Sequence, residues 1–159
     1  MTDITKLTKY AINYLSKFSS SKSNLEYILK KKIRNYNIDK KQKFLLYNSL
    51  STIIYNLEKN NFINDRTYCL SKIRFFIHQG KSKIYMQSYF YQKGIEKEIV
   101  LEAFQEYDLN DSDWELESAK IFVRKKRLEN KPEYKEKNLS KMARAGYKYD
   151  LCIKILNEF

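Results

Sequence analysis

The chain has 159 residues and a formal net charge of +12, with 43% hydrophobic and 31% charged residues, a composition typical of a folded protein and not of a disordered one. Its three glycines and one proline are too few for an all-β protein that turns about every 8–12 residues. No apolar run approaches the roughly 18–20 residues of a membrane span, and the N-terminus lacks a secretory signal pattern. We therefore expect neither secretion nor membrane contact.

The positive charge is concentrated near the N-terminus, where residues 1–60 carry 12 basic and 4 acidic side chains. A basic balance favours an anionic partner, either nucleic acid or an acidic protein surface. The joint abundance of Lys, Asn, Ile and Tyr has a second explanation, because an AT-rich genome produces it whatever the function. The charge alone leaves both interpretations open.

Apolar residues at three- and four-residue spacings predict a first helix over residues 4–18. Ser23 and Glu26 have the spacing of a capping box, which predicts a second helix that runs to about Arg34. A third periodic stretch follows. These three helices form a predicted first unit, residues 1–60.

The pattern then begins again. Asn64 and Asp65 can cap a helix that ends at Gly80, and the next helix stops at Gly94, a residue that favours helix termination. With a third helix, these make a predicted second unit, residues 61–108.

The last part of the chain has the same organisation. Ser112 and Glu115 have the spacing of another capping box. Pro132 suits the first turn of the following helix, which ends at Gly146. With a final helix, these make a predicted third unit, residues 109–159.

The repeat is visible directly when Gly94 is placed on Gly146, an offset of 52 residues that aligns Phe104 with Leu156. A unit of this size has little core of its own, so neighbouring units are expected to share apolar surface. The predicted fold class is all-α, with tandem three-helix repeats (about nine helices) that form an elongated, curved array.

Three segments of the chain resemble the signatures of the RecX family, in the family's order and at compatible spacing. Residues 62–69 (FINDRTYC) are similar to the family's aromatic residue and Ile-Asp-Asp before an Arg-Phe-Ala helix. Residues 80–95 are similar to its basic segment that ends in Lys-Gly-Ile, and residues 145–156 to its closing Gly-Phe-x-Tyr-Asp stretch. Thr67 departs from the pattern, because the family usually carries arginine there.

The resemblance implies a bacterial, cytoplasmic, all-helical protein that acts as a regulator in recombination, DNA repair and the SOS response. Members of the family bind the RecA recombinase, dock in the groove of the RecA–DNA filament, slow ATP hydrolysis and limit strand exchange. We therefore expect the RecA filament as partner, DNA directly or within that filament, and a monomeric chain. The resemblance is weakest in residues 1–60.

The candidate partner-binding residues are basic side chains that close helices or fall on the family's motif positions. They are Lys30, Lys31, Lys32, Arg34, Lys81, Lys83, Lys93, Arg124, Lys125, Lys126, Arg127, Lys141 and Arg144. For the clusters at 30–34 and 124–127 there is an alternative, because positive charge at a helix C-terminus offsets the macrodipole.

The sequence contains few of the residues and motifs that are typical of enzymes. His78 is the single histidine, the two cysteines show no metal-ligand spacing, and neither a P-loop nor a dinucleotide-binding fingerprint is present. We expect no enzymatic activity, no catalytic residue, no metal and no cofactor. Cys69 and Cys152 are predicted to be buried free thiols.

The fourteen tyrosines suggest base stacking as one role, but most of them, including Tyr10, Tyr14, Tyr89 and Tyr149, fall on or beside apolar faces. Half-buried packing is the predicted role for most of these rings.

Two further functions remain open beside RecA regulation. A helical nucleic-acid-binding module that acts independently of RecA would have similar basic three-helix units. A purely structural scaffold would need only the repeat.

Overall fold

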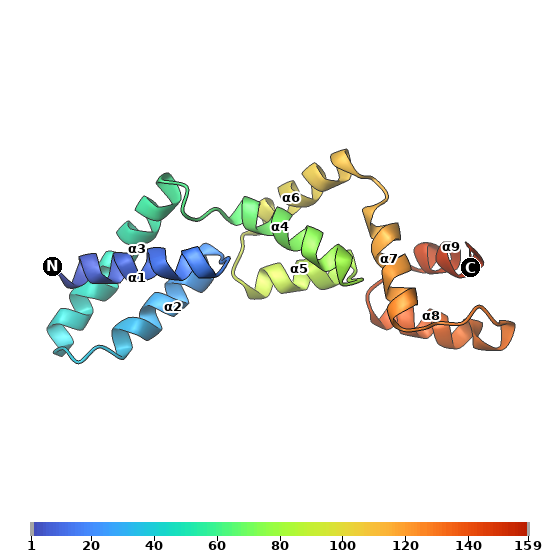
Figure 1. The fold of residues 1–159 in the computed structure, drawn as a ribbon, viewed down its shortest axis with the longest axis horizontal. Helices are drawn as coiled ribbons and strands as arrows, with labels where there is room; N and C mark the ends of the chain where they lie inside the picture. Colours follow the sequence, from blue (N-terminus) through green and yellow to red (C-terminus); the bar gives the residue numbers. More distant parts are fainter. Residues whose placement is uncertain (1, 159) are drawn as a thin grey trace. The chain divides into compact units, whose positions relative to one another are not determined.

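The computed structural model describes residues 2–158, which form nine α-helices, one short 3₁₀ helix and no strand (Figure 1). The helices are α1 (Asp3–Lys17), α2 (Lys22–Arg34), α3 (Lys40–Lys59), α4 (Asp65–His78), α5 (Lys83–Gln92), α6 (Lys97–Asn110), α7 (Trp114–Lys125), α8 (Lys135–Arg144) and α9 (Tyr149–Glu158), with the 3₁₀ turn at Pro132–Tyr134. The predicted all-α class is confirmed. Over the described range, no helix combines the length and apolarity that crossing a bilayer requires.

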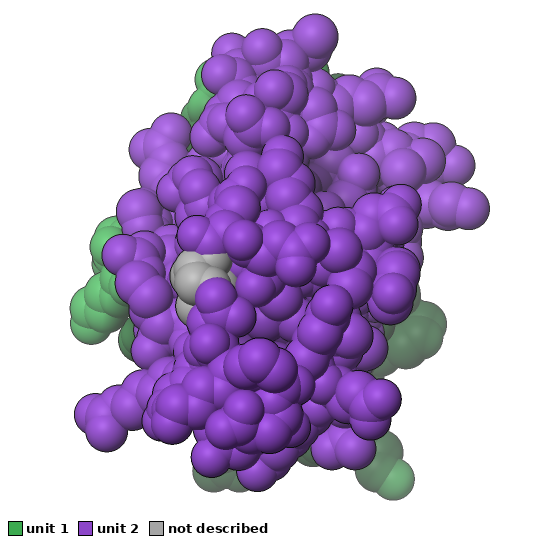
Figure 2. Space-filling view, turned by 90° about the vertical axis from the view of Figure 1, so that its right-hand side faces the viewer, with its two compact units in different colours: residues 1–68, 93–96 green, residues 69–92, 97–159 purple. Residues whose placement is uncertain are grey.

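The chain divides into two compact units, shown in green and purple in Figure 2. Unit 1 comprises residues 1–68 and 93–96, and unit 2 comprises residues 69–92 and 97–159. The boundary falls inside α4. The division into three units at residues 60/61 and 108/109 stays a prediction.

Unit 1 is built on the packing of α1, α2 and α3, whose apolar faces meet in one core. On α2 the residues at four-residue spacing, Leu25, Leu29 and Ile33, are completely buried, as the 3.6-residue period of a helix requires. Leu46 and Leu50 supply the matching face of α3.

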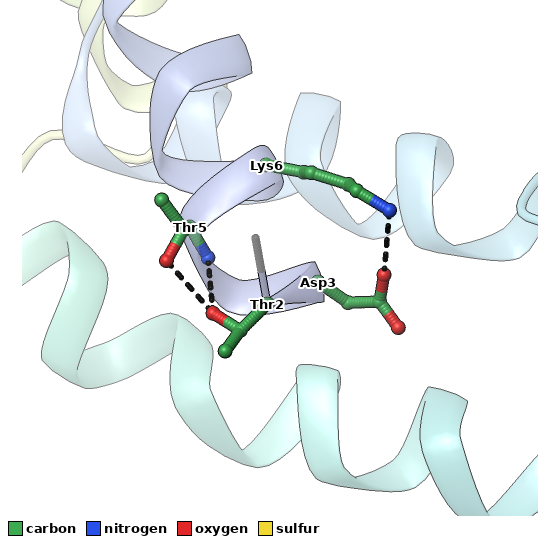
Figure 3. Close-up of polar contacts among 4 residues, drawn as sticks. All are labelled: Thr2, Asp3, Thr5 and Lys6. Atoms are coloured by element: carbon green, nitrogen blue, oxygen red, sulfur yellow. Dashed lines mark hydrogen bonds and ion pairs between the residues drawn. The ribbon is translucent and has the colours of Figure 1, made fainter.

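The N-termini of these helices are closed by side-chain oxygens. Thr2 accepts a hydrogen bond from the amide of Thr5 at the start of α1, next to an ion pair between Asp3 and Lys6 (Figure 3). Asp39 and Gln42 form a capping box on α3, which sequence analysis missed.

The predicted capping box at Ser23 is wrong, because Ser21 caps α2 by accepting from the amide of Asn24. Ser23 instead donates to the carbonyl of Gly94. The predicted capping box at Ser112–Glu115 is also wrong. Trp114 is the first residue of α7, and the side chain of its N-cap residue makes no capping hydrogen bond.

Unit 2 has a core rich in aromatic rings. Phe76 packs edge-on against Tyr89, and Phe104 stacks on Trp114 with ring centroids 5.8 Å apart. The buried Trp114 indole donates to the carboxylate of Asp108. A second cluster, formed by α7, α8, α9 and the loops between them, includes Ala119, Met142, Tyr147, Cys152 and Ile155.

The predicted helix terminators Gly80, Gly94 and Gly146 all have positive φ, at 70°, 73° and 96°. This left-handed conformation is the usual helix C′ geometry and favours glycine. Cys69 and Cys152 are both buried thiols outside any disulfide, which confirms that prediction.

One set of hydrogen bonds occurs in both units. In unit 1, Ser21 Oγ donates to the carbonyl of Lys93, and the amide of Lys22 donates to the buried carboxylate of Asp65. The residue after Lys93 is Gly94.

Unit 2 repeats this arrangement. Ser82 Oγ donates to the carbonyl of Ala145, which precedes Gly146, and the amide of Lys83 donates to Glu115. Each serine also caps its own helix. We call these two sets the serine joints. They are the structural counterpart of the repeat seen in the sequence.

Candidate anion-binding groove

Two neighbouring cavities of unit 2 form a groove between the α4–α5 turn, α7 and α8. The first, of about 280 Å³, is lined by Gln79, Gly80, Lys81, Tyr85, Phe122, Lys125, Lys126 and Ala145. The second, of about 490 Å³, is lined by Phe122, Lys126, Lys141, Arg144 and Ala145. The two share Phe122, Lys126 and Ala145. We call the joined depression the basic groove.

The α4–α5 turn can approach α7 only because residue 80 is glycine. A Cβ at Gly80 would lie 2.8 Å from the backbone nitrogen of Phe122, a distance shorter than normal atomic contact. This approach places Lys81 beside the basic end of α7. On the other side, the 2.7 Å hydrogen bond from Ser82 to the carbonyl of Ala145 holds α5 against the end of α8, where Arg144 lies.

Neutral groups hold the cations at one end of the groove. Lys81 Nζ lies 4.6 Å from the ring centroid of Tyr85, within cation–π range. Lys125 Nζ donates to the side-chain oxygen of Gln79 at 3.1 Å. No carboxylate lines either cavity. Five positive charges therefore face one groove without a neutralising acid in its wall, which favours an anionic occupant.

A third depression continues the basic groove. It has a volume of about 160 Å³ and shares Lys141 with the second cavity. It adds two cations, Arg127 and Lys137, and one acid, Glu129. The cationic surface therefore extends past α8 to the loop that follows α7.

The structure brings together five of the thirteen predicted residues, Lys81, Lys125, Lys126, Lys141 and Arg144, with Arg127 at the extension. It does not place Lys83 or Arg124 among the residues that line these cavities. Lys83 Nζ lies 5.2 Å from the centroid of the Phe104 ring. Arg124 lines a separate depression with Glu117 and Glu158.

The remaining predicted residues belong to unit 1. Lys93 accepts the hydrogen bond of Ser21 through its carbonyl. Lys30 pairs with Glu26 at 2.7 Å, and Lys32 Nζ lies 4.6 Å from the centroid of the Tyr10 ring. These residues are therefore described by their contacts within unit 1.

The lining residues that sequence analysis missed include Gln79, Tyr85, Phe122 and Lys137. A local signal existed for one of them, because Phe122 lies four residues before Lys126, the spacing of one helical face. No local pattern connects residue 81 to residue 144.

Within residues 2–158, no group of three or more His, Cys, Asp or Glu side chains is arranged to hold a metal ion. His78 is exposed at the end of α4.

Comparison with known proteins agrees with the fold. No protein-family profile matches the chain. The regulatory protein RecX of Myxococcus xanthus (strain DK1622) is 24% identical over 161 residues, an alignment that spans 96% of this chain and 85% of that protein. The crystal structure of RecX from Lactobacillus salivarius superposes with a TM-score of 0.72 and 23% identity, over 98% of this chain and 96% of that one.

The chain is a homologue of RecX and has the RecX fold. A second crystal structure, of a regulatory protein RecX, superposes with a TM-score of 0.71 and 19% identity, over 97% of this chain and 73% of that one. The resemblance to RecX read from three sequence segments is thereby confirmed. The alignments also include residues 1–60, where those segments gave least support.

Proposed function

We propose that this protein regulates the RecA recombinase by binding the RecA–DNA filament and restraining its ATP hydrolysis and strand exchange. The observation that carries the proposal is the alignment with a regulatory protein RecX over 96% of the chain, together with the shared fold. RecA is the partner that the family resemblance implies. The protein acts by binding and has no catalytic role in this proposal.

The basic groove is the proposed contact surface. Its five cations meet no carboxylate in the lining, so an anionic filament surface or a DNA backbone would gain charge-assisted contacts there. Contacts of this kind weaken as salt rises, because counterions compete for the same charges.

The test is the DNA-dependent ATP hydrolysis of the cognate RecA, titrated with the protein at moderate salt. We expect inhibition by the wild-type chain at near-stoichiometric concentration. The groove variant Lys126→Gln/Lys141→Gln/Arg144→Gln should need roughly tenfold more protein for the same effect, the equivalent of about 1.4 kcal/mol of binding.

The control variant removes three exposed lysines of unit 2 that line none of the described cavities, Lys97→Gln/Lys148→Gln/Lys154→Gln. It has the same net charge as the groove variant, so equal loss in both would indicate a general charge effect and contradict the groove assignment. No inhibition by wild-type protein in near-stoichiometric excess would refute the proposal. Strong, salt-sensitive binding to naked DNA with no effect on RecA would favour the alternative, a nucleic-acid-binding module that acts without RecA.

A further inference from the structure

The corner between α2 and α3 in unit 1 carries the densest charge of the chain. Residues 27–47 contain seven basic side chains and one acidic side chain, a net charge of +6 out of the chain's +12. We call this segment the α2–α3 corner. None of these residues lines the basic groove.

An aromatic ring and cations share the outer face of α2. Tyr27 is 60% exposed, and Lys31 and Arg34 follow it at four- and seven-residue spacing, so the three lie on one stripe of the helix. Lys31 and Arg34 are also exposed. The residues that face the core, Leu25 and Leu29, are completely buried.

The start of α3 repeats this combination. Phe44 is 63% exposed and lies four residues after Lys40 and three after Lys41, both of them exposed. The helix begins at the Asp39 capping box. Lys43 Nζ donates to the carbonyl of Arg34 at 2.8 Å, which ties the start of α3 to the end of α2.

Structural roles account for only part of this charge. Lys30 pairs with Glu26, Lys32 lies over the Tyr10 ring, and Lys43 closes the end of α2. The helix macrodipole equals only about half an elementary charge. Four cations remain, Lys31, Arg34, Lys40 and Lys41, and none of them is in an ion pair among residues 2–158.

We propose that the α2–α3 corner binds single-stranded nucleic acid, with phosphates at these four cations and bases stacked on Tyr27 and Phe44. Exposed rings beside cations are how proteins hold single strands without sequence preference. A duplex keeps its base faces stacked inside the helix, so the rings would gain nothing from it. The inference does not rest on the proposed regulation of RecA.

The test uses the full chain without RecA, so its failure leaves the proposed function untouched. Fluorescence anisotropy would compare a labelled oligothymidylate with a blunt duplex of the same length, and flotation would test vesicles of phosphatidylcholine and phosphatidylserine. We expect the oligothymidylate to bind roughly tenfold or more tightly than the duplex, and the vesicles to remain unbound.

The rings have a control in Tyr55, an exposed aromatic residue on the same helix as Phe44. Tyr27→Ala/Phe44→Ala should weaken oligothymidylate binding by roughly tenfold or more, since each stacked base adds substantially to affinity. Tyr55→Ala should change it less than about twofold, although Tyr55 is 62% exposed, because it lies outside the corner. All three positions are exposed, so the variants are expected to keep the wild-type circular dichroism spectrum.

The cations are tested by salt dependence. The association constant falls as salt rises, so the slope of log affinity against log salt is negative. Lys31→Gln/Lys41→Gln should make that slope less steep by ~1.4 for a single strand. Lys17→Gln/Lys59→Gln, which removes two exposed lysines of unit 1 outside the corner, should leave the slope unchanged.

Duplex bound as tightly as single strand would overturn the proposal, and so would equal binding by the Tyr27→Ala/Phe44→Ala variant and the wild-type chain. Binding that is lost in the groove variant and kept in the corner variants would move the site to the basic groove. Vesicle binding without oligothymidylate binding would make the corner a membrane-surface contact instead.

Discussion

A single hydroxyl group connects three parts of unit 2 beneath the basic groove. The phenol of Tyr147 donates to the carbonyl of Gly80 at 2.9 Å and lies 3.2 Å from the hydroxyl of Ser118 on α7. Tyr147 is 3% exposed, and its ring packs against Phe122. It therefore supports the position of both the α4–α5 turn and a floor residue of the groove.

Burial raises the pKa of Tyr147 above its ordinary value of 10.0, because the phenolate would lose its hydration. The folded state therefore keeps a proton that the unfolded state releases. The stabilisation from the neutral phenol is complete below pH 10 and is lost as the pH rises toward the folded-state pKa.

Urea unfolding of the wild-type chain and of Tyr147→Phe between pH 8 and pH 11, a range of about three units that brackets the ordinary tyrosine pKa, measures this effect. The free energy of unfolding of the wild-type chain should fall more steeply above pH 10, because the variant has no phenol to ionise. Parallel pH profiles would contradict the assignment. Lys22, whose pKa is raised by its hydrogen bond to Glu58, titrates equally in both proteins.

Exposure is the residue-scale property that periodicity predicted least well. Tyr10, Tyr14 and Tyr89 are partly buried, as expected, but Tyr149 is 68% exposed, so its predicted packing role is wrong. The spacing of apolar residues shows which side of a helix faces a core. It does not show how far the neighbouring helix extends over the flanking positions.

At the scale of helices, glycine ends two of them in the same conformation but in different surroundings. Gly80 and Gly94 have nearly equal positive φ. A Cβ at Gly80 would meet the backbone of Phe122, whereas a Cβ at Gly94 would meet only the side chain of Ser23, at 2.6 Å. The Phe122 backbone is fixed inside α7. Rotation of Ser23 moves its Oγ but not its Cβ, so a methyl group at residue 94 requires a small shift of the first turn of α2, where Ser23 is exposed.

Replacing either glycine by alanine should therefore destabilise the chain by different amounts. Gly94→Ala is expected to lower the free energy of unfolding by roughly 1–2 kcal/mol, the cost of the left-handed conformation and of a small shift at the start of α2. Gly80→Ala should cost roughly 1–3 kcal/mol more, because of the added clash. Urea denaturation followed by circular dichroism measures both, and equal losses would show that α7 shifts as easily as the start of α2.

The helix starts were predicted less well than the helix ends. Ser23 and Ser112 have the capping-box spacing, yet Ser21 caps α2 and no side chain caps α7. Around the start of α2, four of the five residues 19–23 are serines. The choice among them depends on Lys93 and Gly94, whose carbonyls accept from Ser21 and Ser23. A local pattern cannot include such distant partners.

At the scale of the whole molecule, the two serine joints contain the same set of hydrogen bonds, one set in each unit. Each has a serine hydroxyl that donates to a carbonyl just before a glycine, and a helix-start amide that donates to a carboxylate. Ser21 and Ser82 are both completely buried. The two joints are therefore expected to contribute comparable stability.

Ser21→Ala and Ser82→Ala should each lower the free energy of unfolding by about 1–3 kcal/mol, since each removes a helix cap and leaves a partly buried carbonyl without its partner. Ser51→Ala, at an exposed position within α3, should change it by less than about 0.5 kcal/mol. Thermal melts of the three variants measure the effect. A loss in only one joint variant would show that the two joints are not equivalent.

The sequence by itself determined the helices, the 52-residue repeat, the glycine terminators and the RecX relationship, because each depends on residues close together in the chain or on their order. Only the tertiary structure decided which cations share a surface. Lys81 meets Lys126 and Arg144 because Gly80 lets one turn approach α7, while Lys83 and Arg124 face elsewhere. The basic groove is formed by contacts between residues that are distant in sequence. Such contacts produce no periodic pattern in the sequence, so they could not be predicted from it.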